Sequence, residues 1–181
     1  MKKLFLLFLS TSLFVSCKND TASPPPTDAT ASKTAPPVEF IDAKYTEIGK
    51  KYLAAMESGD MDSYMSNYAD NAKYYWNNGD SLVGKAAIDK FWRNRRDNVI
   101  ETIKFEQNIW LPIKVNELEN VPMTGNWLLS WYKVTAKYKG GKTMTQRMHI
   151  NFHFDENDKI DMASQYVDRS LIEAAMPPVK K

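Results

Sequence analysis

The sequence predicts an α+β domain in which one curved sheet wraps around N-terminal helices. Apolar residues first recur at spacings of three and four, as in amphipathic helices, and later alternate with polar residues, as in strands. A run of helices followed by a run of strands, without βαβ alternation, is typical of an α+β fold. The pattern occupies residues 38–181, a length that fits one domain.

Three helices are predicted in the first half of this domain. An apolar stripe over 40–56 predicts the first helix, which ends at Ser58-Gly59. Asp60 is expected to cap a short second helix, because aspartate accepts hydrogen bonds from free N–H groups at helix starts. A third helix is predicted from Lys85 to about Asn98. Its expected buried residues are Ala86, Ile88 (or Ala87), Phe91 and Trp92.

Strands dominate the second half. A first strand is expected at 73–76 with a turn at 77–80, before the third helix. Gly140-Gly141 predicts a tight hairpin, and 156–159 predicts another turn. The sheet is therefore expected to be mixed or antiparallel, and to curl over the apolar stripes of the helices. The later strands are expected at about 100–115, 126–139, 142–155 and 160–168.

Residues 1–16 have the layout of a secretory signal. A basic start at Lys2 and Lys3 precedes an apolar stretch that is shorter than the roughly 20 residues of a membrane span. The sequence Phe14-Val15-Ser16-Cys17 resembles the lipobox of bacterial lipoproteins, in which a diacylglyceryl-modified cysteine follows the cleavage site. The resemblance implies lipid on Cys17 and attachment to a membrane of the cell envelope. The alternative is an unmodified cysteine in a signal that happens to end there.

Residues 17–37 read as a tether, rich in proline, threonine and serine and without a large apolar side chain to bury. The segment 18–20 resembles signals that send lipoproteins to the outer membrane, facing the periplasm or the cell surface. Cys17 is the only cysteine, so no internal disulfide is possible.

The charge pattern argues against nucleic-acid binding. The net charge of +2 comes from the N-terminal segments, because acidic and basic residues are equal in number from Glu39 onward. A nucleic-acid-binding domain would show a basic face. The arginines at 93–96 share their helix with Asp89 and Asp97, which favours a solvated helix face.

Two groups of motifs stand out in the domain. The first comprises 68–72, 82–88 and Phe91-Trp92, and the second comprises the strand–turn–strand of 152–160 followed by 166–168. Together they resemble SnoaL-like domains of the nuclear transport factor 2-like superfamily. The resemblance implies a cone-shaped fold with helices packed in a curved sheet. Asp158 replaces the usual turn glycine. This fold hosts isomerases, cyclases, hydratases, dehydratases and binding modules, so it does not define a function.

The resemblance also implies one candidate catalytic residue. Asp168 matches the acid/base carboxylate of SnoaL-type cyclases, and strict alternation from Ile160 would place it on the inner face of its strand. A carboxylate in an apolar pocket has a raised pKa and can transfer protons near neutral pH. The favoured alternative is that Asp168 caps a helix that begins near Arg169. The expected pocket residues are Tyr74, Trp76, Trp92, Met162 and Tyr166.

The opposite face of the sheet is expected to form a homodimer, as related domains commonly pair sheet to sheet. Alternation places Trp127 and Trp131 on this face, together with His149 and His153. The histidines would lie about 13 Å apart along one strand, too far to share a metal ion. If the strand phase were reversed, the two tryptophans would line the pocket instead.

The sequence leaves two classes of function open. The favoured one is a lipid-anchored module that binds a small apolar ligand or a protein partner. The alternative is a cofactor-independent acid/base enzyme of isomerase, cyclase or dehydratase type that uses Asp168 on a small hydrophobic substrate. No phosphate loop, dinucleotide fingerprint, nucleophile elbow or metal-ligand cluster is found, so no cofactor or metal is expected.

Overall fold

The computed structural model describes residues 35–117 and 123–177. The predicted signal peptide, the lipidation site Cys17 and the tether up to residue 34 lie outside the described residues. The described residues belong to one compact unit that begins at Ala35. None of the helices in this part of the chain is long and apolar enough to cross a membrane.

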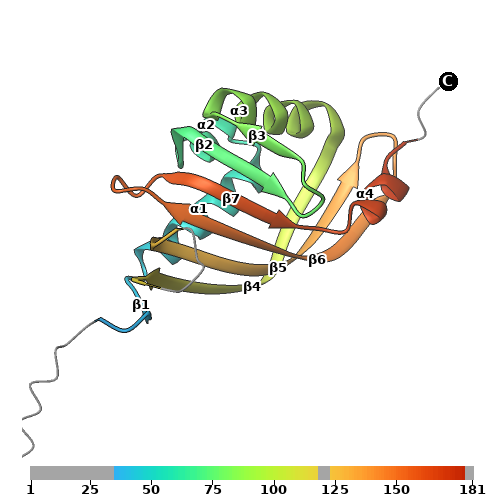
Figure 1. Cartoon of the computed structure of the whole chain (residues 1–181). Coiled ribbons are helices and arrows are strands. Elements are labelled where there is room, and N and C mark those ends of the chain that lie inside the picture. The colour runs from blue at the N-terminus through green and yellow to red at the C-terminus, as the bar shows by residue number, and fades with distance from the viewer. Residues whose placement is uncertain (1–34, 118–122, 178–181) are drawn as a thin grey trace, which may run out of the picture. The chain divides into compact units, whose positions relative to one another are not determined.

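The predicted α+β class is confirmed, with helices α1 to α3 in the concave side of a curved mixed sheet (Figure 1). The helical elements are α1 (Lys44–Ser58), α2 (Met61–Met65), α3 (Lys85–Asn94), the π-helical turn η1 (Arg95–Val99) and α4 (Arg169–Ala175). The strands are β1 (Val38–Phe40), β2 (Tyr68–Trp76), β3 (Ser81–Val83), β4 (Ile100–Val115), β5 (Gly125–Tyr138), β6 (Thr143–Phe154) and β7 (Ile160–Tyr166).

The seven strands form a single sheet in the order β1-β4-β5-β6-β7-β2-β3. All neighbouring pairs are antiparallel except β2 and β7, which run parallel. The long strands β4, β5 and β6 bend around α1, and α4 packs on β6 at the far end (Figure 1). This arrangement encloses a space between the helices and the inner face of the sheet.

Gly49 allows α1 to lie close to the sheet. A Cβ atom at this position would come within 2.5 Å of the Trp110 ring and 2.7 Å of the Leu128 side chain. Glycine normally weakens a helix interior, so close packing is the reason for it here. The core below α1 is aromatic, and its fully buried large side chains include Tyr64, Tyr68, Tyr74 and Phe152.

Several helical predictions need correction. Phe40 lies in β1, where it pairs with Ile113 and is 78% exposed, because the edge of β4 offers it hydrogen-bonding partners before α1 begins. Ala86 is exposed, whereas Ile88 is fully buried. The Asp60 cap is confirmed, since its side chain accepts a hydrogen bond from the Ser63 amide.

A β-bulge in β7 reverses the predicted phase of that strand. Ile160 pairs with Phe154, but Met162 pairs with His153, so Asp161 is an extra residue without a partner. Such an insertion changes which side chains face inward beyond it. The expectation that Met162 and Tyr166 face the inner side is therefore wrong. The buried residues after the bulge are Ala163, Gln165 and Val167.

Asp158 takes the backbone conformation that glycine usually supplies in the 156–159 turn. Its φ is 58°, in the left-handed region that aspartate tolerates better than most residues. The carboxylate accepts hydrogen bonds from Lys44 Nζ (2.8 Å) and Tyr45 Oη (2.7 Å), and these contacts lower the pKa of Asp158. The turn is thereby fastened to the start of α1.

Candidate functional site: an aromatic cavity in the cone

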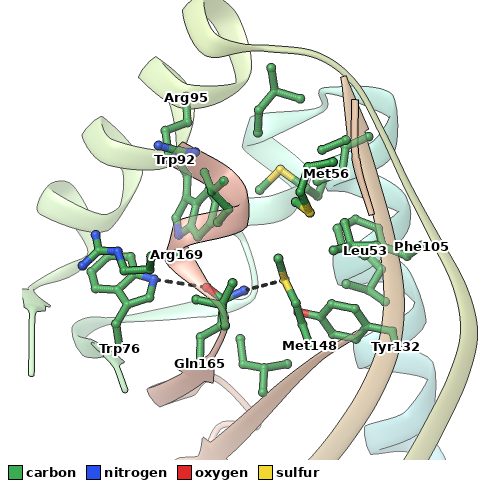
Figure 2. A pocket seen from close by; sticks show the side chains of 18 of the residues that line it. Leu53, Met56, Trp76, Trp92, Arg95, Phe105, Tyr132, Met148, Gln165 and Arg169 are labelled. Carbon is green, nitrogen blue, oxygen red and sulfur yellow. Dashed lines mark hydrogen bonds between the residues drawn. The ribbon is translucent and has the colours of Figure 1, made fainter. Parts of the chain in front are cut away.

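A cavity of about 290 Å³ lies between the helices and the inner face of the sheet. Its walls come from α1, α2, β2, α3, η1, β4 to β7 and α4 (Figure 2). The volume is near the lower end of small-molecule pockets. Aromatic side chains dominate the wall: Tyr52, Tyr64, Tyr74, Trp76, Phe91, Trp92, Phe105, Tyr132 and Tyr138.

Gln165 is the central polar group of this wall. Its Oε1 accepts hydrogen bonds from Tyr74 Oη (2.8 Å) and Trp76 Nε1 (3.2 Å). Its Nε2 lies 3.6 Å from the sulfur of Met148, and a thioether is a weak acceptor; the side chain also contacts the Tyr132 hydroxyl. The carboxamide oxygen is therefore occupied, while the amide N–H groups keep capacity for a better acceptor. Strict alternation missed Gln165 because the bulge at Asp161 brings it inward.

Three buried tyrosines on α1, α2 and β2 form a hydroxyl cluster beside the cavity. Tyr52 Oη is hydrogen-bonded to the hydroxyls of Tyr64 and Tyr68, the latter at 2.9 Å. Burial raises the pKa of all three phenols. They therefore stay neutral in the folded domain and supply hydrogen bonds rather than a general base.

Neighbouring arginines in η1 perform different tasks. Arg96 donates from Nε to the carbonyl of Met56 (3.1 Å) and from Nη2 to that of Glu57 (3.2 Å), at the C-terminal end of α1. A cation here satisfies free carbonyls and complements the helix dipole. Arg95 instead lines the cavity, and burial lowers the pKa of its guanidinium. The prediction of a solvated face is therefore wrong for Arg95.

Only some of the pocket residues predicted from the sequence line the cavity. It places Tyr74, Trp76 and Trp92 in the cavity wall. Met162 and Tyr166 lie outside it, on the opposite face of the sheet, because of the bulge in β7. Their assignment to the pocket is corrected accordingly.

Asp168 does not line the cavity either. Its Oδ1 accepts hydrogen bonds from the Ser170 amide (2.9 Å) and the Ser170 hydroxyl (2.6 Å), so it caps α4. These hydrogen bonds lower the pKa of Asp168, whereas an acid/base role in an apolar pocket requires a raised one. Among the described residues that line the cavity, the one carboxylate is Glu173 on α4, which is exposed, and none is a histidine.

The outer face of the sheet carries a second group of aromatic residues. β5 buries Leu128, Ser130 and Tyr132 on the inner side, so the predicted phase of this strand is confirmed and Trp127 points outward. Trp131 stacks on His149 with ring centroids 4.4 Å apart. Other contacts on this face include Trp127 with His153 (centroids 5.0 Å apart) and His153 Nδ1 with Asp161 Oδ1 (2.6 Å). The described residues contain no group of three or more His, Cys, Asp or Glu placed to hold a metal ion.

The fold defines the structural class of the protein. Solved structures of the nuclear transport factor 2-like class share this architecture. An example from Burkholderia xenovorans aligns with a TM-score of 0.54 at 16% identity, over 76% of this chain and 99% of that one. A candidate polyketide cyclase from Xanthomonas campestris pv. campestris gives 0.58 at 17% identity, over 73% and 96%. An LEH-like epoxide hydrolase from M. tuberculosis gives 0.53 at 13% identity, over 74% and 90%.

Within this class, the chain belongs to the SnoaL-like domain family, whose model matches residues 50–161. No curated protein matches the chain. At these identities the structural neighbours establish the fold alone. The function has to be inferred from the residues of the cavity itself.

Proposed function

We propose that this domain binds a small, mainly apolar molecule in the cavity. The observation that carries the proposal is a cavity with an aromatic wall in which two hydrogen bonds fix Gln165. Sites for small molecules combine apolar walls with a few positioned polar groups in this way. A volume of about 290 Å³ holds about ten non-hydrogen atoms, if each takes roughly the volume of a water molecule.

Binding is favoured over acid/base catalysis by the position of the titratable groups. The Asp168 carboxylate caps the start of α4. Burial stabilises the neutral form of wall tyrosines such as Tyr52 and Tyr74. Proton transfer needs a group that changes its protonation state near the working pH. The described cavity wall contains donors and apolar surface but no buried base.

Filling the cavity should abolish ligand binding without unfolding the domain. Ala136 is a buried cavity residue on β5, and Ala136→Phe adds a ring to the space that a ligand would occupy. We expect isothermal titration with cinnamamide, a neutral probe of suitable size, to show a loss of about tenfold or more in affinity. Ala86→Phe adds the same ring on the exposed surface of α3 and should leave binding unchanged. Equal affinity in Ala136→Phe and wild type would reject the cavity as the site.

We further propose that the domain is held at a membrane of the cell envelope by lipid on Cys17. The support is the lipobox-like sequence after an apolar stretch. Intact-mass measurement of the protein purified from membranes of a bacterial host should show loss of residues 1–16 and a diacylglyceryl-modified Cys17. An unmodified cysteine in the mature protein would refute the anchor.

The partner that the outer face fits best is a second copy of the chain. Five apolar side chains on it are exposed: Phe40 (78%), Ile109 (55%), Tyr166 (51%), Val38 (39%) and Trp131 (37%). They belong to β1, β4, β5 and β7 of the same sheet, and exposed apolar residues gathered on one face mark a contact surface. A two-fold dimer would cover them with the same residues of the other copy.

Charge on this face should prevent dimer formation. Trp131→Glu would place two carboxylates in the apolar centre of the proposed interface, where burying an unpaired charge is costly. We expect a dimer for wild type and a monomer for Trp131→Glu in analytical ultracentrifugation. Leu171→Glu, an exposed apolar position on α4, should remain dimeric. A monomeric wild type at micromolar concentration would contradict the proposal.

A further inference from the structure

The cavity wall contains N–H groups with unused hydrogen-bonding capacity. Gln165 directs its amide at the Met148 sulfur, which is a weak acceptor. Trp92 Nε1 is buried and has no hydrogen-bond partner among the described residues. Arg95 adds a guanidinium to the same wall. A ligand with acceptor atoms would use this capacity, because N–H groups cannot accept hydrogen bonds from one another.

Trp92 and the two arginines of the wall lie on one side of the cavity, and Gln165 lies between this side and Met148. Figure 2 shows Arg95, Trp92 and Arg169 along one wall, with Leu53, Phe105 and Tyr132 on the opposite wall. The cavity is therefore polar at one end and apolar at the other. A molecule with a polar head and an apolar body fits such a division.

Arg95 is the cation in this wall that has no carboxylate partner among the described residues; its side chain contacts the Tyr138 hydroxyl. It forms no ion pair with any described carboxylate. Its guanidinium lies 5.7 Å from the ring centroid of Phe91. By contrast, Arg169 is paired with Asp80 and lies over the Trp76 ring. Glu173 is the acidic residue at this wall, and it is exposed and unpaired with either arginine among the described ion pairs.

We propose that the ligand is a small carboxylic acid with an apolar body, and that its carboxylate binds at Arg95 beside Trp92 and Gln165. A carboxylate matches the planar fork of an arginine, and a charge-assisted hydrogen bond is about twice as strong as a neutral one. A partly buried guanidinium without a counter-ion gains most from such a partner. The apolar body would contact Leu53, Phe105 and Met148.

This inference rests on the proposed binding function, and a matched pair of probes separates the two. Cinnamate and cinnamamide share size and shape but differ in charge. Titration calorimetry of residues 35–181, the compact unit of the chain, should give a Kd about tenfold or more lower for cinnamate. Equal Kd values would overturn the carboxylate assignment while leaving the binding function intact. No binding of either probe would overturn both.

The role of Arg95 is tested with the same probes. Arg95→Gln should weaken cinnamate binding to the level of cinnamamide and leave cinnamamide binding unchanged. Arg93→Gln removes a charge that pairs with Asp62 and Asp89 outside the cavity, and should keep the preference for cinnamate. Retention of the preference in Arg95→Gln, or an equal loss for both probes, would overturn the assignment. If Arg95→Gln does not fold, the wild-type comparison still decides the ligand class.

Discussion

Raising the pH above 10 is expected to unfold the domain cooperatively. Burial raises the pKa of five phenols in the core above the ordinary value of 10.0: Tyr52, Tyr64, Tyr68, Tyr74 and Tyr132. The folded state keeps these protons at a pH where the unfolded chain releases them. Their stabilising effect is complete below about pH 10 and is lost as the pH rises toward the folded-state pKa values.

The size of this effect follows from the number of phenols. Each one lowers the free energy of unfolding by about 1.4 kcal/mol per pH unit above pH 10, so five remove about 7 kcal/mol per unit. Since domains of this kind are stable by about 5–15 kcal/mol, unfolding should occur within about two pH units. Circular dichroism and tyrosinate absorbance should change together.

A control variant isolates the contribution of one phenol. Tyr132→Phe removes one titrating group from the inner face of β5 and should make the loss of stability with pH less steep. The account is wrong if all tyrosines ionise while the circular dichroism spectrum of the folded domain persists. Such a result would mean that the phenols are open to water.

Replacing Gln165 by leucine should destabilise the domain by about 2–6 kcal/mol. The substitution leaves Tyr74 Oη and Trp76 Nε1 without their acceptor, and each unsatisfied buried donor costs about 1–3 kcal/mol. Urea unfolding measures the change in free energy. A side chain of similar size is retained, so a cavity contributes little.

The matched variant for this test is Tyr74→Phe. It removes one donor but leaves Gln165 Oε1 bonded to Trp76, so the expected cost is only about 1 kcal/mol. The difference between the two variants measures the penalty of unsatisfied groups. If Gln165→Leu were as stable as wild type, Gln165 would not organise the cavity wall.

Local sequence patterns were sufficient to predict most of the helices and strands and the fold class. The alternation in 142–155 places Met148 and Ile150 inside, as observed, and the aspartate at position 60 caps its helix. These features depend on side-chain periodicity and on hydrogen bonds a few residues apart. Such interactions can be predicted from the sequence because both partners lie within a few residues of each other.

The candidate site was harder to predict, because two local irregularities position it. The extra residue Asp161 turns Gln165 inward and Met162 outward. The second irregularity is the π-helical turn after α3, in which Arg95 lines the cavity and Arg96 contacts the end of α1. Both irregularities depend on packing against distant segments, which periodicity does not report.

At the edge of the sheet, a long-range contact also overrides the local sequence pattern. Phe40 continues the helical spacing of the following residues, yet it pairs with Ile113 of β4. The competing partner is more than 70 residues away in the sequence, so the local pattern favours a longer helix. Long-range pairing overrides helix periodicity at this point.

The most direct test of the proposed binding function is to locate a neutral probe by NMR. Methionine methyl groups distinguish the cavity from the outer face of the sheet, because Met56 and Met148 line the cavity and Met162 does not. With cinnamamide bound, we expect intermolecular NOEs to the methyl groups of Met56 and Met148 and none to Met162. NOEs to Met162 alone, or no NOE to any cavity methyl group at saturating probe, would contradict binding in the cavity.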